Sequence, residues 1–230
     1  MSNMINVTID GITVSVPEGS TVLEAARAAH VNIPTLCYLK DVQQIGACRL
    51  CLVEASGTRG LGAACVLPAA DGMVVKTNTE NIREQRRINL ELLLANHNRE
   101  CTSCIRSENC EFQALCREYG VKDYPFDGVK TETKVDEVSL SIVRDNSKCI
   151  KCRRCVATCN KIQKIGAIGA SKRGFKTTIG SVFGRSLVDS PCVNCGQCIL
   201  ACPTGALHEK ESINEVWAAI NDPTKHVVVQ

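Results

Sequence analysis

The sequence predicts an α+β protein that is divided into several small domains, and three observations lead to this fold class. Hydrophobic residues make up 44% of the 230 residues, which argues against a disordered chain. Aromatic residues make up only 3%, so large aromatic anchors for a single extensive core are scarce. Sixteen residues are Cys, and they occur in four separate groups, of which the first follows a hairpin-and-helix pattern and the second a helical stretch.

Composition and charge exclude several classes of protein. The formal net charge is +3 and the basic residues are scattered, which is not typical of a nucleic-acid-binding domain. The longest apolar run, near residues 92–95, is too short to span a membrane, and the first residues contain no secretory signal pattern. We therefore expect a cytoplasmic protein with no membrane span, whose cysteines are metal-binding thiolates rather than disulfides.

The N-terminal region predicts a β-hairpin followed by a helix. Apolar and polar residues alternate over residues 5–9 and 12–16, and Asp10-Gly11 between them is a strong hairpin-turn signal. Thr21 and Glu24 form a capping-box pattern, so a helix should begin after Thr21.

The first cysteine group follows this helix with the spacing C-x10-C-x2-C-x13-C, and its members are Cys37, Cys48, Cys51 and Cys65. A central C-x2-C pair with one cysteine on each side is similar to the plant-type [2Fe–2S] pattern, although the first gap is longer here. A structural zinc site is the alternative. Together with the hairpin and the helix, the group predicts a β-grasp [2Fe–2S] ferredoxin domain over residues 1–78.

The second group follows a stretch with helical periodicity, Asn81 to Asn96, and has the pattern H-x3-C-x2-C-x5-C. Its members are His97, Cys101, Cys104 and Cys110. One imidazole and three thiolates would complete a [4Fe–4S] site, and Cys116 competes with His97 as the fourth ligand. We expect residues 79–120 to form a small helical domain. Residues 121–137 are polar with a Pro and a Gly and predict a linker.

The last two groups share the spacing C-x2-C-x2-C-x3-C of bacterial ferredoxins. They comprise Cys149, Cys152, Cys155 and Cys159, and Cys192, Cys195, Cys198 and Cys202. In two-cluster ferredoxins the fourth cysteine of each run binds the other cluster. We therefore assign Cys202 to the [4Fe–4S] cluster of the first run and Cys159 to that of the second, and we expect a helix to begin at each fourth cysteine. Paired zinc knuckles are the alternative, but they would leave cysteines over.

The segment around these runs carries two further predictions for the ferredoxin-like domain, residues 138–210. The 32 residues between Cys159 and Cys192 contain several glycines, and they predict an inserted hairpin. Four basic residues surround the first run: Lys148, Lys151, Arg153 and Arg154. We expect a solvated face that compensates the negative charge of the clusters, with a docking patch as the alternative.

Motifs for other chemistry are absent from the sequence. It contains no G-x-G-x-x-G, no Walker A sequence, no Ser/His/Asp order, no HExxH and no isolated nucleophile that stands apart from the candidate ligands. We therefore expect no catalytic site within these 230 residues, which would conduct electrons through one [2Fe–2S] and three [4Fe–4S] clusters.

The order of these four cysteine groups resembles the N-terminal iron–sulfur relay of multi-cluster [FeFe]-hydrogenases, and the resemblance covers essentially the whole chain. The same order also resembles the N-terminus of NAD-dependent formate dehydrogenases and, in part, the large iron–sulfur subunit of respiratory complex I. The resemblance implies that His97, rather than Cys116, completes the second group. It also implies the crossed assignment of Cys159 and Cys202.

The resemblance further implies electron transfer to a hydrogen-converting domain outside these residues. The length and the complete set of relay motifs resemble NAD(P)-linked, electron-bifurcating hydrogenases. Their partners would be flavin- and NAD(P)-binding subunits, small iron–sulfur subunits and soluble ferredoxin. The alternative is an electron-transfer subunit or N-terminal region of a formate dehydrogenase. Residues 211–230 resemble the helix and strand that lead into the hydrogenase catalytic domain, and we expect Val227 to Val229 to continue as a strand.

Overall fold

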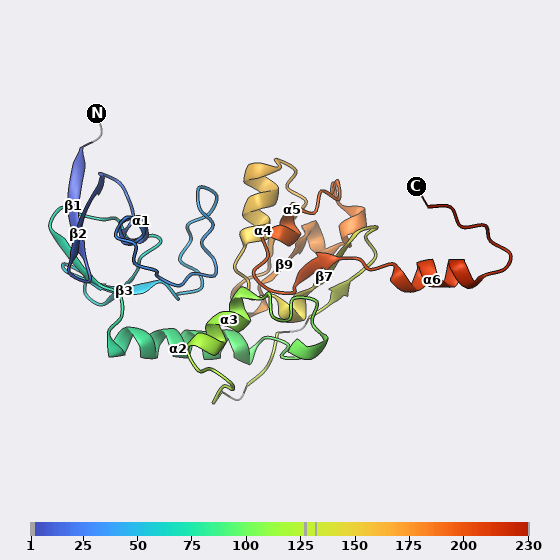
Figure 1. The fold of residues 1–230 in the computed structure, drawn as a ribbon, viewed down its shortest axis with the longest axis horizontal. Coiled ribbons are helices and arrows are strands. Elements are labelled where there is room, and N and C mark those ends of the chain that lie inside the picture. Colours follow the sequence, from blue (N-terminus) through green and yellow to red (C-terminus); the bar gives the residue numbers. More distant parts are fainter. Residues whose placement is uncertain (1–2, 127, 132, 230) are drawn as a thin grey trace.

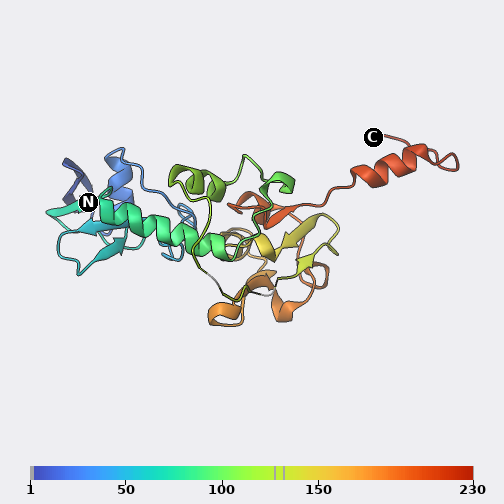
Figure 2. The same cartoon turned by 90° about the horizontal axis from the view of Figure 1, so that it is seen from below.

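The computed structural model describes residues 3–126, 128–131 and 133–229. The chain forms an elongated molecule with a sheet region at each end of a central helical segment, and a C-terminal helix projects beyond the second sheet region (Figures 1 and 2). The structure thus combines helices and sheets, as the sequence predicts. None of the described helices has the length and hydrophobicity needed to cross a membrane.

The N-terminal region is a mixed five-stranded sheet with the order β2-β1-β5-β3-β4. Its strands are β1 (Met4–Ile9), β2 (Ile12–Pro17), β3 (Leu52–Ala55), β4 (Leu61–Ala63) and β5 (Met73–Lys76). Strands β1 and β2 form the predicted hairpin, in which Ile9 pairs with Ile12. Asp10 and Gly11 both have positive φ, 48° and 87°, as a two-residue hairpin turn requires.

Helix α1 (Val22–Ala28) packs against this sheet. The Thr21 hydroxyl accepts from the Glu24 N–H, and the Glu24 carboxylate accepts from the Thr21 N–H, so the predicted capping box is confirmed. Val22, Leu23, Ala25 and Ala26 are buried with Val7, Ile9 and Val75 of the sheet. The apolar face of the helix therefore covers one side of the sheet and closes the N-terminal core.

The central segment consists of α2 (Glu80–Ala95), a 3-10 turn η1 (Cys101–Ser103) and α3 (Glu111–Glu118). Helix α2 matches the predicted helix to within one residue at each end. Arg86 of α2 is 3% exposed, and its guanidinium donates to the carbonyls of Leu52 and Thr77 and to the Tyr119 hydroxyl. This buried cation ties the N-terminal sheet to both central helices.

The C-terminal region contains a three-stranded sheet with the order β10-β7-β6. Its strands are β6 (Val135–Asp136), β7 (Ile142–Asp145) and β10 (Leu207–Glu209). Strand β6 lies inside the stretch that the sequence predicts as a linker. Asp136 of this strand pairs with Arg144 of β7 and is buried, so the end of the stretch belongs to the sheet.

The helices beside the two cysteine runs begin earlier than predicted. Helix α4 (Arg154–Ala157), continued by a π-helical turn (Thr158–Ile162), and helix α5 (Gln197–Leu200) each contain the third cysteine of a run. Cys159 lies in the π-helical turn and Cys202 follows α5. The prediction that the fourth cysteine starts a helix is therefore wrong. Each helix begins after a left-handed residue, Arg153 or Gly196, two positions before the third cysteine.

The predicted inserted hairpin is confirmed as β8 (Ile168–Ser171) paired with β9 (Thr178–Ser181). Its inner side chains, Ile168 and Ile179, are buried in the same core as Cys155 and Cys202. The insertion therefore forms a wall of the cysteine-containing core.

The C-terminal tail differs in part from the prediction. Helix α6 (Ile213–Asn221) is present and projects from the sheet (Figure 1), but Val227 to Val229 do not form a strand. Val228 is 71% exposed, and no strand of the described structure lies beside it to supply hydrogen-bonding partners.

Candidate iron–sulfur sites

The four cysteines of the first group meet in the loops that flank β3 and β4. All four are buried, with Cys51 directly before β3 and Cys65 two residues after β4. The Leu36 N–H donates to Cys48 Sγ at 3.4 Å, and the Cys48 N–H donates to Cys37 Sγ at 3.4 Å. Such N–H donors stabilise a thiolate and raise the reduction potential of a cluster bound by it.

The pKa values of these cysteines are shifted because their thiols lie close together. Thiols of Cys48 and Cys65 donate to Cys37 and lower the pKa of Cys37 well below its ordinary value. The donation to Cys37 correspondingly raises the pKa of Cys48. Close thiolates repel one another, so the four thiols cannot easily all lose their protons. A cationic iron core bound between them would offset this repulsion and allow all four cysteines to be deprotonated together.

His97 and the cysteines of the second group line one cavity of about 340 Å³ between α2, η1 and α3. Cys101 lies in η1, Cys104 ends it, and Cys110 caps α3 by accepting from the Gln113 N–H at 3.5 Å. Cys116, on α3, lines the same cavity and is 8% exposed. The structure thus brings both competing fourth residues to this cavity.

The environment of His97 fits a metal ligand. Its ring packs edge-on against Phe112, with the ring centroids 5.1 Å apart. The Nδ1 atom is buried and has no hydrogen-bond partner among the described residues. Burial, together with the positive charge of Lys148, lowers the pKa of His97 to about 4. The imidazole is therefore neutral near pH 7, which is the form that binds metal.

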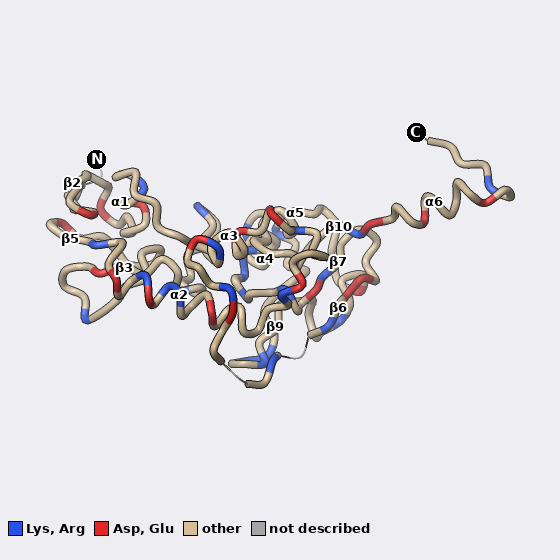
Figure 3. The backbone as a smooth tube through the Cα atoms, turned by 60° about the horizontal axis from the view of Figure 1, so that its bottom comes forward, with Lys and Arg blue, Asp and Glu red and all other residues tan. Residues whose placement is uncertain are grey.

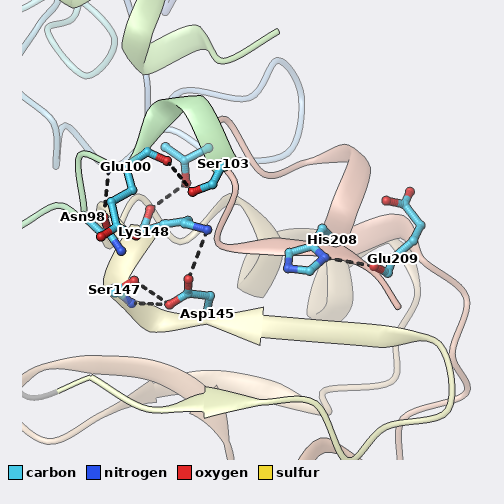
Figure 4. Close-up of polar contacts among 9 residues, drawn as sticks. Asn98, Glu100, Ser103, Asp145, Ser147, Lys148, His208 and Glu209 are labelled. Carbon is cyan, nitrogen blue, oxygen red and sulfur yellow. Dashed lines mark hydrogen bonds and ion pairs between the residues drawn. The ribbon is translucent and has the colours of Figure 1, made fainter. Parts of the chain in front are cut away.

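The loop that carries Cys101 and Cys104 is fixed to the C-terminal region (Figure 4). The Asn98 N–H donates to the Ser147 carbonyl at 2.9 Å, which joins the loop to the C-terminal region. Within the loop, Ser103 Oγ donates to the Glu100 carbonyl at 3.3 Å. Lys148 lies beside this loop and pairs with Asp145 at 3.3 Å. His208, in contrast, contacts the carbonyl of Glu209 on its own strand.

The two ferredoxin runs interleave in space. One cavity is lined by Cys149, Cys152, Cys155 and Cys202, and another is lined by Cys159, Cys192, Cys195 and Cys198. Each fourth cysteine therefore lies with the first three cysteines of the other run. Burial raises the pKa of Cys152 and of Cys198 to about 12, so these thiols would lose their protons when iron binds.

The basic residues around the first run do not form the solvated face that the sequence predicts. Arg153 is exposed, but Arg154 is only 7% exposed and pairs with Glu111 at 2.8 Å. Lys148 and Lys151 are half-buried. Because Lys148 and Lys151 also bond to neighbouring elements, most of these cations hold the structure together around the cysteine cavities.

Two residues that sequence reasoning did not find connect the sites. Gln43 is 5% exposed, and its Nε2 donates to the carbonyls of both Cys37 and Cys152 at 2.8 Å. Arg106, in the loop before α3, donates to the Cys202 carbonyl at 2.9 Å. The first ferredoxin cavity is thus joined to the N-terminal cysteines by one residue and to the His97 cavity by the other. No local motif marks these contacts, since their partners lie far apart in sequence.

Gly205 packs against the His97 cavity. An added Cβ at this position would lie 2.6 Å from Cys104 Sγ. We expect Gly205→Ala to displace Cys104 and to weaken or abolish iron binding at the His97 cavity, because a buried overlap of this kind forces side chains or backbone to shift. Iron content and the absorbance of the purified chain would measure the loss.

Gly169 provides the matched control for this substitution. An added Cβ there meets no atom within 4 Å, and its φ is not in the left-handed region. Gly169→Ala should keep the full iron content. Normal iron content in Gly205→Ala would show that Cys104 does not need its present position.

Family models match three consecutive parts of the chain. A "2Fe-2S iron-sulfur cluster binding domain" covers residues 2–80, and an "NADH-ubiquinone oxidoreductase-G iron-sulfur binding region" covers residues 86–125. A "4Fe-4S dicluster domain" covers residues 148–206. Each match falls on one of the regions where the structure gathers cysteines.

Curated relatives include hydrogenases and an NADH-ubiquinone oxidoreductase subunit. NADP-reducing hydrogenase subunit HndD of Solidesulfovibrio fructosivorans is 45% identical over 99% of this chain and 40% of its own length. Iron hydrogenase 1 of Clostridium pasteurianum is 37% identical over 98% of this chain and 40% of its own. The mitochondrial NADH-ubiquinone oxidoreductase 78 kDa subunit of Candida albicans is 33% identical over 90% of this chain and 28% of its own. The chain thus spans less than half the length of these relatives.

A solved structure is similar over nearly all of its chain. A chain of the NAD+-reducing [NiFe]-hydrogenase in the H2-reduced state superposes with a TM-score of 0.84 and 32% sequence identity. The match covers 90% of this chain and 88% of that chain. Sequence and structure therefore point to the same group of proteins.

Proposed function

Because this chain belongs to the iron–sulfur relay family that hydrogenase subunits and the 78 kDa subunit of NADH–ubiquinone oxidoreductase share, we propose that it carries electrons through four iron–sulfur clusters in a hydrogen-metabolising oxidoreductase. The full enzyme would be an NAD(P)-linked iron-only hydrogenase of the electron-bifurcating type. Flavin- and NAD(P)-binding subunits, small iron–sulfur subunits and soluble ferredoxin would be its partners. The relatives reported above favour this proposal over a formate dehydrogenase.

In this proposal each gathered set of residues holds one cluster. Cys37, Cys48, Cys51 and Cys65 hold a [2Fe–2S] cluster in a β-grasp domain, and His97 with Cys101, Cys104 and Cys110 holds a [4Fe–4S] cluster. The crossed sets, Cys149, Cys152, Cys155 with Cys202 and Cys192, Cys195, Cys198 with Cys159, hold two more. Bound clusters of these types take up and release one electron at a time.

The observation that carries the proposal is the direct connection between the cysteine cavities. The Gln43 amide bonds to backbone carbonyls at two of the sites, and Arg106 bonds to the Cys202 carbonyl from the wall of a third. Cys110 Sγ also lies 3.6 Å from the Pro203 carbonyl. Those of Gln43 are buried, and together the contacts hold neighbouring sites beside one another, as stepwise electron transfer over short distances requires.

The proposal is tested by reductive titration of the anaerobically purified chain, followed by electron paramagnetic resonance. We expect four one-electron centres, of which one is of [2Fe–2S] type and three are of [4Fe–4S] type. A chain that takes up no electrons at low potential would contradict the relay function.

Gln43→Leu should separate the first site from the ferredoxin-like region. The substitution removes two buried hydrogen bonds and leaves two carbonyls without a donor, so we expect a loss of roughly 2 kcal/mol or more of stability. Electron transfer from the [2Fe–2S] centre should slow, as followed by freeze-quench spectroscopy. Gln44 is exposed and adjacent, so Gln44→Leu is the control and should leave both quantities unchanged. Equal behaviour of the two variants would exclude a bridging role for Gln43.

A further inference from the structure

Positive charge is concentrated in one continuous part of the chain. Between Asp145 and Asp189 there are ten Lys and Arg residues and no Asp or Glu, although the chain as a whole has 24 acidic residues. Six of the ten belong to the segment after Cys159, which forms the inserted hairpin and its flanks. The clusters add negative charge nearby, but the insertion itself is uniformly basic.

The basic residues of the insertion face solvent. Lys172, Arg173, Lys176 and Arg185 are exposed, and none of their side chains forms an ion pair within residues 3–126, 128–131 and 133–229. Figure 3 shows basic positions gathered around the turn beside β9. We call Lys172, Arg173 and Lys176 the basic turn. Because these cations neither pair nor support the fold, their charge is available to a partner.

The basic turn also carries an exposed aromatic ring. Phe175, at the centre of the turn, is 56% exposed, and Phe183, which follows β9, is 89% exposed. The chain contains only four Phe residues, and two of them are exposed on this one insertion. Exposed aromatic side chains surrounded by charge are typical of protein–protein interfaces.

The turn lies directly on a cysteine loop. Lys151 Nζ donates to the Phe175 carbonyl at 3.2 Å, and its ammonium lies 5.7 Å from the Phe175 ring. The backbone N–H of the same Lys151 donates to Cys149 Sγ at 3.4 Å. A single residue therefore separates the exposed turn from a cysteine of the first ferredoxin cavity.

We propose that the basic turn docks the acidic face of a small one-electron carrier protein and brings its redox centre next to the site that contains Cys149. This inference rests on the relay function proposed above and assigns a place of electron exchange to it. The uniform positive charge selects a negatively charged partner, and Phe175 supplies the apolar contact. A nucleic acid would match the charge, but it would gain nothing from the contact with a redox site.

The exchange at this surface needs no bond chemistry. One electron leaves the centre of the carrier, which is oxidised, and enters the cluster held by Cys149, Cys152, Cys155 and Cys202, which is reduced. In the opposite direction the same electron returns, and neither direction requires a proton or a leaving group.

The test uses the full chain with its clusters and the triple variant Lys172→Glu, Arg173→Glu and Lys176→Glu. We measure by stopped flow its reduction by a pre-reduced acidic ferredoxin, and its oxidation by a basic cytochrome c after reduction with dithionite. At low ionic strength we expect the variant to react about 10-fold or more slowly with the ferredoxin and faster with the cytochrome. Both differences should disappear in about 0.5 M salt.

A second triple variant controls for net charge. Arg59, Lys76 and Arg83 are exposed in the N-terminal and central regions, and Arg59→Glu, Lys76→Glu and Arg83→Glu change the net charge by the same amount. This control should react with ferredoxin almost as fast as the parent chain. An equal loss in both variants would overturn the assignment of the site and leave only a net-charge effect.

Two further outcomes also count against the proposal while leaving the relay function intact. The proposal fails if the basic-turn variant accepts electrons from ferredoxin at the parent rate. It also fails if the variant loses retention on a polyanion column with no change in electron transfer, because that result would indicate nucleic-acid binding. If instead neither chain is reduced by dithionite, the relay function itself is wrong.

Discussion

His97→Ala should abolish iron binding at the cavity between α2 and α3 and lower the iron content by about four atoms per chain. The substitution removes the buried imidazole whose Nδ1 lacks a hydrogen-bond partner in the described structure. The three remaining thiols would leave one iron without a protein ligand. Metal analysis and electron paramagnetic resonance of the purified variant measure the loss directly.

Cys116→Ala is the matched control, because both side chains line the same cavity. It should keep the full iron content, since Cys116 packs in the apolar cluster that contains Leu90 and Phe112. His97→Cys should keep the cluster at a lower reduction potential, because a thiolate adds one negative charge. Loss of the cluster in Cys116→Ala, with retention in His97→Ala, would reverse the ligand assignment.

Asp136→Asn should strongly destabilise the C-terminal region. Asp136 is 4% exposed and pairs with buried Arg144 at 3.2 Å, and it also accepts from Ser186 Oγ and the Leu187 N–H. Removing one partner of a buried ion pair costs about 3–5 kcal/mol, because the other charge stays buried without compensation. Thermal bleaching of the cluster absorbance should move down by about 10 °C.

The pH dependence of this effect follows from the pKa of Asp136. Burial acts to raise that pKa, but the hydrogen bonds from Ser186 and Leu187 and the charge of Arg144 outweigh it and lower the pKa. A lowered pKa means that the stabilisation is complete above the ordinary value of about 4 and declines at lower pH. The difference between Asp136→Asn and the parent chain should therefore stay constant from about pH 6 to about pH 9.

Glu137 offers a control for Asp136, because it is adjacent and exposed. Glu137→Gln should change the stability by no more than about 0.5 kcal/mol. Equal stability of Asp136→Asn and Glu137→Gln would show that the buried pair with Arg144 contributes nothing.

Local patterns in the sequence predict much of this structure. The Asp10-Gly11 turn, the Thr21–Glu24 capping box and helix α2 depend on residues a few positions apart, and the structure contains all three. The cysteine spacing also predicts the grouping of the residues, including the positions of Cys159 and Cys202. The crossed grouping joins residues that are far apart in sequence, and it could be predicted because two-cluster ferredoxins share this cysteine spacing.

The features that the sequence does not predict depend on long-range contacts. Gln43 bonds to a carbonyl 109 residues away, and Gly205 must be small only because Cys104 packs against it. Arg154 is expected on a solvated face, yet its side chain is buried and pairs with Glu111, whose own side chain is 49% exposed. The terminal valines have strand propensity, but a strand needs a second strand to pair with, and no described strand lies beside them.

Iron and acid-labile sulfide analysis of the anaerobically purified chain tests the central claim most directly. Four clusters predict about 14 iron atoms per chain with an equal amount of sulfide and little zinc. A content of about four metal atoms, mostly zinc and without sulfide, would contradict the claim and show that the cysteine groups are structural zinc sites.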